Sequence, residues 1–257
     1  LELRRRDGTV IWLHLKADVV AVDDDAPELI GALQDVTKQK QVDQLIEYQA
    51  NYDQLTALPN RALFLDRLQN ALRQSRRRST RIAVLFIDLD NFKSVNDNLG
   101  HDAGDELLIE SARRIQSCVR DDDTLARHSG DEFVALIGDV FAASVASRIA
   151  EKMITCMREP FMIGERQVYC GASVGVSFYP EDGDSADTLV IKADQAMYEV
   201  KKSGRNSWQF YTAAMQLESE RKHQLYNELV AAVNDDQLIV HYQPVVSAET
   251  GCIVGCE

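Results

Sequence analysis

The sequence contains no apolar run near the roughly 18 residues that a membrane-spanning helix needs, and it lacks a signal-peptide pattern. We therefore expect no membrane contact in this chain and a cytoplasmic location. The first residue is Leu1 rather than methionine, so we interpret the 257 residues as a piece of a longer protein. Whether the full-length protein has a membrane anchor upstream is left open.

Basic residues are scarce relative to acidic ones. The chain has 28 Lys and Arg against 41 Asp and Glu, which gives a formal net charge of −13. This balance argues against a nucleic-acid partner, because a surface that binds nucleic acid normally carries a basic face. It still permits a nucleotide substrate whose phosphates are neutralised by metal ions.

Cysteines are few, odd in number and without CxxC spacing, which argues against a disulfide framework and against a zinc site. We expect all five to be reduced thiols. The 45% hydrophobic and 27% charged residues are typical of a soluble globular protein. Its length allows one substantial core plus smaller pieces.

An acidic cluster ends one apolar run of the chain. The alternation along residues 84–87 predicts a buried strand that delivers Asp88 at its end, and Asp90 follows two positions later. We expect the Asp88 side chain to be surface-accessible at this strand end.

A second acidic pair, Asp131 and Glu132, precedes the apolar run at residues 134–137. Residues 129–130 predict a tight turn before it, because glycine tolerates backbone angles that other residues resist. Carboxylates from two neighbouring strand ends form the kind of hard-oxygen site that Mg²⁺ uses when it also holds phosphates. Taken alone, the pair is more typical of a solvated acidic turn than of a functional site.

Residues 127–133 resemble the signature of the GGDEF family of diguanylate cyclases, with Ser129 in place of the first glycine. Three further segments resemble family motifs in the same order, and they lie at residues 53–61, 86–105 and 193–206. The resemblance implies an α/β domain of the layered α+β kind, with a central, mostly antiparallel sheet flanked by helices. In the family this is a palm-like βαββαβ nucleotidyl cyclase fold.

The resemblance implies a metal-dependent enzyme that condenses two GTP into cyclic di-GMP and two pyrophosphates. Asp88 and Asp131 would hold Mg²⁺ or Mn²⁺, assisted by the Leu89 carbonyl. Asp131 is also the family's candidate for proton removal, with Glu132 beside it. Each site holds one GTP, so the active form is expected to be a homodimer.

The family's substrate contacts map onto further residues of this chain. Asn96 and Asp105 match positions that recognise guanine, and a carboxylate there can accept both hydrogens of the guanine N1–N2 edge, which adenine lacks. Taken singly, the same two residues are typical of helix ends. The remaining substrate-binding residues expected from the resemblance are Lys93, His101, Ser129, Gly130, Lys201 and Arg205.

Arg120 and Asp123 form an RxxD pattern five residues before the turn, which in this family resembles the inhibitory site for cyclic di-GMP. Ser129 adds a side chain where the family signature has glycine, so the resemblance predicts the fold but does not decide whether the domain turns over GTP. One alternative is therefore a weak or inactive module that binds GTP or cyclic di-GMP and regulates an adjoining EAL phosphodiesterase. A purely structural or dimerising role is the other alternative, against which the metal and guanine residues argue.

The resemblance divides the chain into four parts. Residues 1–37 resemble the end of a PAS sensor domain, with a loop at 23–27, although an unrelated hairpin fits them too. Residues 38–52 predict a linker helix whose apolar seam suits either a coiled coil or packing on its own domain. The cyclase domain covers 53–211, and 212–257 resemble a connecting helix and the truncated start of an EAL domain.

Periodicity within the cyclase segment predicts its helices and strands. We expect an amphipathic helix at 60–78 that turns Leu63, Leu65, Leu68 and Leu72 inward. Further helices are expected from about 91, at 103–118, at 141–157 and at 187–202. Strands are expected near 167–179 and at 208–211.

Overall fold

The computed structural model describes residues 2–20, 28–234 and 237–257. Its contacts separate two compact units, Leu1–Tyr211 and Thr212–Glu257. No helix within the described ranges combines the length and the apolar character needed to cross a membrane. All five cysteines are free thiols, and the sulfur atoms of Cys118 and Cys156 lie 3.5 Å apart.

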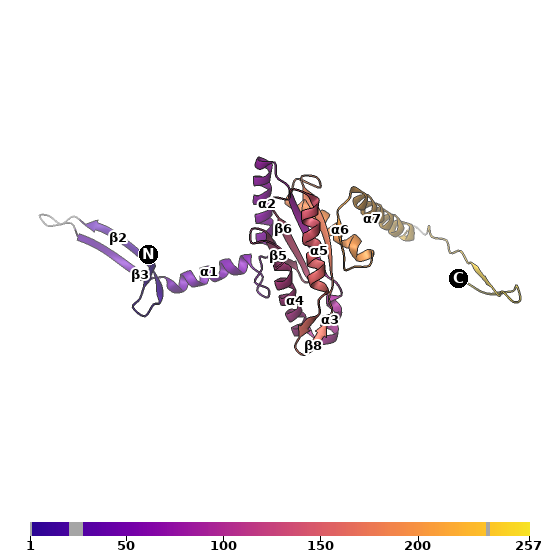
Figure 1. Cartoon of the computed structure of the whole chain (residues 1–257), viewed down its shortest axis with the longest axis horizontal. Helices are drawn as coiled ribbons and strands as arrows, with labels where there is room; N and C mark the ends of the chain where they lie inside the picture. Colours follow the sequence, from indigo (N-terminus) through magenta and orange to yellow (C-terminus); the bar gives the residue numbers. More distant parts are fainter. Residues whose placement is uncertain (1, 21–27, 235–236) are drawn as a thin grey trace. The chain divides into compact units, whose positions relative to one another are not determined.

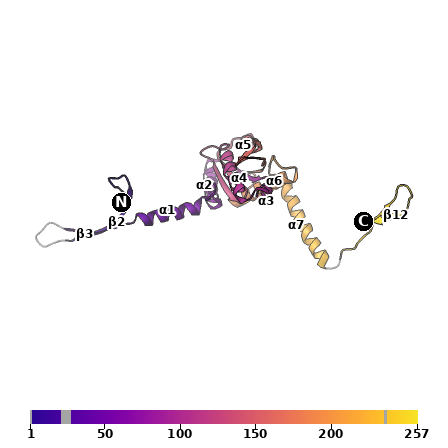
Figure 2. The same cartoon turned by 90° about the horizontal axis from the view of Figure 1, so that it is seen from below.

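A five-stranded sheet with helices on both faces forms the centre of the first unit (Figures 1 and 2). Its strand order is β10-β9-β4-β6-β5, and every neighbouring pair is antiparallel except β9 and β10. The predicted fold class is confirmed. In chain order the elements are α2 (Arg61–Arg78), β4 (Ile82–Leu89), α3 (Phe92–Leu99), α4 (His101–Gln116), β5 (Thr124–Ser129), β6 (Glu132–Ile137), α5 (Ala143–Arg158), β7 (Phe161–Ile163), β8 (Arg166–Val168), β9 (Ala172–Tyr179), α6 (Ala186–Lys202) and β10 (Trp208–Phe210).

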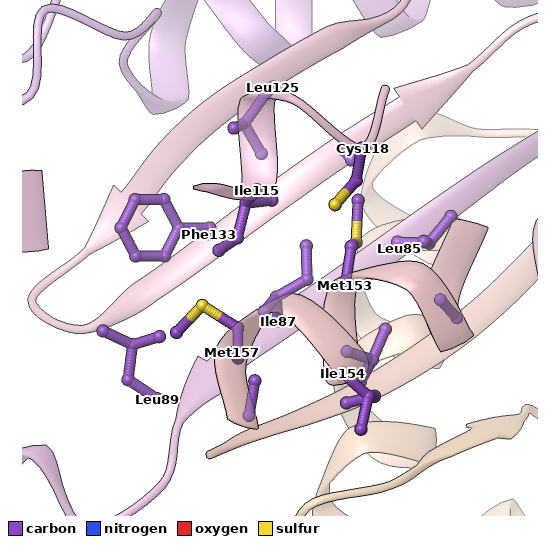
Figure 3. Packing of buried hydrophobic residues seen from close by; sticks show 14 of the residues in the cluster. Leu85, Ile87, Leu89, Ile115, Cys118, Leu125, Phe133, Met153, Ile154 and Met157 are labelled. Atoms are coloured by element: carbon purple, nitrogen blue, oxygen red, sulfur yellow. The ribbon is translucent and has the colours of Figure 1, made fainter. Parts of the chain in front are cut away.

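Strand β4 lies in the middle of the sheet, and all eight of its residues are buried. Because side chains alternate across a strand, its residues divide between two core layers. Leu85 and Ile87 pack with α4 and α5, as Figure 3 shows around Ile115 and Met153. The intervening β4 residues pack with α2 and α6, and these are Ile82, Val84 and Phe86. The same alternation directs Asp88 toward the layer of α6.

Helix α2 was placed correctly, but its buried face differs from the prediction. Asn60 caps its start, since the Asn60 side chain accepts the Leu63 N–H at 3.1 Å. Phe64, Leu68, Leu72 and Ser75 are the buried residues, whereas Leu63 and Leu65 are only partly buried. The leucine pattern alone missed Phe64, which is fully buried at the start of that face.

One helix boundary differs from the sequence-based expectation, and one short strand was not expected. Helix α4 begins at His101 rather than at residue 103, directly after Gly100, whose φ is 88°. The strands expected near 167–179 are β8 and β9, and β8 pairs with β7 in a short antiparallel hairpin that was not expected. Sequence periodicity did not reveal β7, because three residues are too few to show alternation.

The chain before residue 53 forms a three-stranded antiparallel sheet and a helix. The sheet consists of β1 (Glu2–Arg4), β2 (Val10–Val20) and β3 (Glu28–Asp35), and helix α1 (Thr37–Asn51) follows it. The Thr37 hydroxyl accepts the Trp12 N–H at 2.9 Å, which ties the start of α1 to β2. The predicted loop at 23–27 lies outside the described residues. The apolar seam of α1 is exposed, with 52% for Val42, 55% for Leu45 and 59% for Ile46.

The second unit consists of helix α7 (Ala213–Asn234) and a small hairpin of β11 (Pro244–Val246) and β12 (Ile253–Cys256). The helix agrees with the connecting helix predicted for residues 212–234. The hairpin residues are exposed.

Candidate functional site

The register of the sheet brings the two acidic clusters together. Asp88, near the end of β4, lies directly opposite Glu132, the first residue of β6. The Leu89 N–H donates to the Asp131 carbonyl at 3.2 Å, so the β5–β6 turn is fastened to the end of β4. This places Asp131 and Glu132 beside Asp88, as the sequence predicted.

Asp88 is a buried carboxylate, with 5% of its surface exposed, which corrects the expectation of an accessible side chain. Burial raises its pKa to about 6, although Lys201 opposes this increase with an ion pair of 2.6 Å between Nζ and Oδ2. The neighbouring charges of Asp131 and Glu132 raise the pKa of Asp88 further. Burial also raises the pKa of Asp131. Negative charge is therefore concentrated here and only partly compensated.

These donors suit a hard divalent cation. Mg²⁺ and Mn²⁺ prefer carboxylate and carbonyl oxygens as ligands. The site offers the carboxylates of Asp88 and Asp131 and the Leu89 carbonyl. A cation would relieve the repulsion that raises the pKa of both carboxylates. The described part of the chain gathers no group of three acidic, histidine or cysteine side chains for a metal. A cation at Asp88 and Asp131 would thus complete its shell with water or phosphate oxygens.

An arginine network supports the tip of the β5–β6 hairpin. Arg127 Nε donates to the Gly130 carbonyl at 2.9 Å, and Arg127 Nη1 contacts both Asp53 oxygens at 3.1 Å. Asp53 also accepts the Thr56 N–H and hydroxyl, at 2.8 and 2.7 Å. The first motif of the chain therefore holds the acidic turn in place. Both motifs were recognised in the sequence, but their contact was not predicted.

The serine at position 129 fits the hairpin without strain. The positive φ of the turn, 43°, falls on Gly130, while Ser129 ends β5 in ordinary backbone geometry. The Ser129 hydroxyl donates to a Glu132 carboxylate oxygen. A serine at this position therefore adds a side-chain contact and leaves the turn geometry intact.

The predicted guanine residues lie at the junction of α3 and α4. Asn96 is on α3, and its Oδ1 is buried without a hydrogen-bond partner among the described residues. A Cβ on Gly104 would lie 1.8 Å from this oxygen, so the close contact of α3 with α4 requires a glycine. Asp105 is exposed in the early part of α4. A buried acceptor without a donor is costly, and a ligand N–H would satisfy it once the Asn96 side chain turns away from Gly104.

The predicted phosphate-binding cations come from two places. Lys93 lies exposed on α3, and His101 lies exposed at the start of α4. Lys201 lies near the end of α6 and contacts Asp88, whereas Arg205 is exposed in the turn after α6. The structure thus joins Lys201, but none of the other cations, to the acidic cluster by an ion pair within the described residues.

The RxxD pattern forms a turn between α4 and β5. Asp123 is 9% exposed, and its carboxylate accepts the Arg120 N–H at 3.0 Å and the Gly138 N–H at 3.2 Å. The Arg120 side chain is exposed. Asp123 therefore stabilises its own turn, and a guanine would have to compete with these two backbone donors.

A cavity of about 670 Å³ lies beside the hairpin, but the predicted metal and guanine residues are not in its wall. We therefore locate the candidate site by the convergence of side chains and not by this cavity. Its lining consists of Asp53, Asn60, Arg61, Ala62, Leu65, Arg127, His128, Ser129 and Gly130.

Residues 50–207 match the family model described as "Diguanylate cyclase, GGDEF domain". The chain is similar to the bifunctional diguanylate cyclase/cyclic di-GMP phosphodiesterase MucR of Pseudomonas aeruginosa, with 45% identity over 208 residues. This match covers 81% of the chain and 30% of MucR. The chain spans less than a third of the length of the first curated relatives that it matches.

Two solved structures resemble the central domain. The isolated GGDEF domain of TpbB (YfiN) from Pseudomonas aeruginosa aligns with a TM-score of 0.64 and 39% identity, covering 66% of this chain and 99% of that one. The coiled coil and GGDEF domain of DgcB from Caulobacter crescentus, solved in complex with c-di-GMP, aligns with a TM-score of 0.62 and 26% identity. That alignment covers 68% of this chain and 93% of the solved DgcB chain.

Proposed function

The chain belongs to the GGDEF-domain diguanylate cyclase family, and on this premise we propose that it condenses two GTP into cyclic di-GMP and two pyrophosphates. The observation that carries the proposal is the register of β4 with β6, which sets Asp88 opposite Glu132 and beside the Asp131 turn. In this reaction the 3′ hydroxyl of one GTP attacks the α-phosphate of the other. Positioning and charge neutralisation then account for most of the rate enhancement.

Asp88, Asp131 and the Leu89 carbonyl would hold Mg²⁺ or Mn²⁺, which when bound supplies Lewis acidity and neutralises phosphate charge. Lys201 fixes the orientation of the Asp88 carboxylate through their ion pair. Burial raises the pKa of Asp131, which strengthens it as a proton acceptor. A metal would reduce that basicity, so Asp131 is better supported as a ligand than as the base. Glu132 lies beside it with its carboxylate bound to Ser129.

Substrate recognition is assigned to the two ends of the site. Asn96 and Asp105 would bind guanine, because the unpartnered Asn96 oxygen needs a donor and Asp105 is accessible. Lys201 would meet the triphosphate at the acidic cluster, while the glycine turn lets the backbone approach it. The further contacts proposed are His101 with the nucleotide and Lys93, Arg205, Ser129 and Gly130 with phosphate.

The wider protein is part of the same proposal. A complete reaction needs two copies of this chain facing each other, so the active form is a homodimer in the cytoplasm. We assign the flanks to the end of a PAS domain and the start of an EAL domain. In the alternative, the domain turns over poorly and binds GTP or cyclic di-GMP to regulate that EAL domain.

The deciding experiment incubates the purified chain with GTP and Mg²⁺ at high protein concentration and separates the nucleotides by chromatography. We expect cyclic di-GMP and pyrophosphate, no product from ATP, and no product with a chelator present. GTP binding without any product would support the regulatory alternative instead. An absence of both binding and product would contradict the proposal altogether.

Product inhibition gives a second prediction. If Arg120 contributes to a cyclic di-GMP site, Arg120→Ala in an Asp131→Ala background should weaken cyclic di-GMP binding at least about tenfold, because a bidentate guanidinium contact is lost. Calorimetry measures the two affinities. Arg113→Ala, which removes an exposed arginine from α4, is the matched control and should bind like the parent. Equal affinity in the Arg120→Ala and parent proteins would remove the inhibitory-site assignment and leave the cyclase assignment standing.

A further inference from the structure

Asp90 belongs to the same acidic cluster as Asp88 in the sequence, yet it has different partners. It is 5% exposed, and both carboxylate oxygens accept hydrogen bonds. Oδ1 accepts the Ser173 hydroxyl at 2.7 Å, and Oδ2 accepts the backbone N–H of Asn206 at 2.9 Å. Asp90 therefore links β9, through Ser173, to the turn after α6, through Asn206.

That turn has an unusual backbone. Gly204, Arg205 and Asn206 have φ values of 118°, 63° and 49°, so three consecutive residues lie in the left-handed region. Residues with a Cβ avoid this region, and two of the three carry one. Such a conformation persists only where surrounding contacts enforce it.

The enforcing contacts converge on Asn206. Arg158 donates from Nη2 to the Asn206 carbonyl at 3.1 Å and from Nε to its Oδ1 at 3.3 Å, while Asp90 holds its N–H. The Arg205 N–H donates to the Val200 carbonyl at 3.0 Å, which closes the end of α6. The backbone on both sides of Arg205 is thus fixed.

Gly171 makes this convergence possible. The Asp90 N–H donates to the Gly171 carbonyl at 2.9 Å. A Cβ at position 171 would lie 3.1 Å from Asp90 Oδ2 and 3.2 Å from the Asn206 carboxamide. The end of β4, the start of β9 and the left-handed turn therefore meet at a point that leaves little room for a side chain.

We propose that Asp90 is a positioning residue that fixes the Arg205 turn for the triphosphate of the substrate. The inference rests on the proposed function and deepens it. Two aspartates at the end of β4 would then position the two cations near the end of α6. Asp88 pairs with Lys201, and Asp90 anchors the turn that carries Arg205.

The test separates phosphate binding from guanine binding. Calorimetry with Mg²⁺ compares a non-hydrolysable GTP analogue with GMP, which lacks the β- and γ-phosphates. Asp90→Ala should bind the GTP analogue about tenfold more weakly, because a displaced cation loses its geometry. GMP affinity should stay within about twofold of the parent. The double variant Asp90→Ala/Arg205→Ala should lose no more than the larger single loss, since the two residues act on one contact.

Conservative variants provide the controls. Asp90→Asn keeps an oxygen for the Asn206 N–H and an amide for Ser173, so it should bind like the parent. Ser173→Ala removes the other partner of Asp90 and should leave triphosphate affinity within about twofold. If Asp90→Ala does not fold, Asn206→Pro replaces it, because proline has no N–H for Asp90 to accept and its fixed negative φ frees the chain from the left-handed turn. That variant should also lose affinity for the GTP analogue only.

Three outcomes overturn the inference alone: equal losses for both nucleotides, fully additive losses in the double variant, or unchanged binding of the GTP analogue by the variant that frees the turn. A parent protein that binds neither nucleotide would overturn the proposed function together with this inference. The two failures are therefore distinguishable by the parent's own titration.

Discussion

Asp88→Asn is expected to abolish cyclic di-GMP synthesis and, at neutral pH without metal, to make the protein more stable. The parent keeps a buried carboxylate there whose pKa is raised to about 6, chiefly by burial. Asparagine has a similar shape and no charge to bury. We expect a gain of about 1–3 kcal/mol in the free energy of unfolding, reduced by the lost Lys201 pair. That corresponds to a melting temperature several degrees higher.

The pH dependence of this effect follows from the direction of the pKa change. A folded-state pKa above the unfolded value of 3.8 means that protonation of Asp88 favours folding. That contribution is fully present below about pH 4 and is lost as the pH rises through about 6. The advantage of Asp88→Asn should therefore be largest above pH 6 and should shrink as the pH falls toward 4.

Thermal and urea unfolding with a chelator, at pH 7.5 and near pH 4.5, measure the stability difference, and product chromatography measures synthesis. Asp139→Asn is the control, because this exposed carboxylate after β6 should change neither quantity appreciably. Added Mg²⁺ should stabilise the parent more than Asp88→Asn if Asp88 binds the cation. A variant that is less stable than the parent at pH 7.5, or that still makes product at the parental rate, would contradict the assignment of Asp88.

Arg127→Ala should reduce both stability and synthesis, because one side chain joins the Asp53 turn to the acidic hairpin. Both partners of the ion pair are largely buried, with 15% and 23% of their side chains exposed. Its removal leaves the Asp53 carboxylate with Thr56 as a partner but without its cation, and it leaves the Gly130 carbonyl without the Arg127 donor. We expect a loss of about 2–3 kcal/mol in the free energy of unfolding. Synthesis should fall about a hundredfold, because the Asp131 turn loses its support.

Arg127→Lys tests whether geometry or charge matters. Lysine keeps the charge but lacks the fork that reaches Asp53 and Gly130 together, so it should recover only part of the loss. Arg113→Ala is the surface control, since its pair with Glu110 is 71% exposed on the arginine side and screened by solvent, so its removal should change stability little. Urea unfolding and product chromatography provide both measurements. If Arg127→Ala behaved like Arg113→Ala, the network would have no role in the site.

The local pattern of the chain was sufficient for several features of the fold. Alternation from residue 84 predicted the buried strand that ends at the acidic cluster, and glycine at 130 predicted the turn, where φ is 43°. Four ordered motifs indicated the family, which the match at residues 50–207 confirms. These features depend on residues close in sequence, so periodicity and turn preference carry the information.

The flanking motifs show the limit of local pattern. Asp53 and Arg127 stand 74 positions apart, and each looks like an ordinary charged residue in its own segment. Their ion pair exists only because α2 and β5 pack side by side. Likewise, the leucines of α2 predicted one buried face, whereas the face that is buried also includes Phe64 and leaves Leu63 and Leu65 only partly buried. Several faces of a helix can have a similar apolar periodicity. Packing against a particular neighbouring element decides which of these faces is buried.

The sequence by itself determined that acidic residues would gather at the end of β4 and at the following hairpin. Only the tertiary structure decided what each of them does. Asp88 and Asp90, two positions apart, acquire different roles because β4 ends at Leu89 and the chain turns at Asn91, where φ is 61°. Asp88 then meets Lys201, and Asp90 meets Asn206, 116 positions away. Burial and partner choice arise from the packing of α6 and β9 on β4, which no local pattern records.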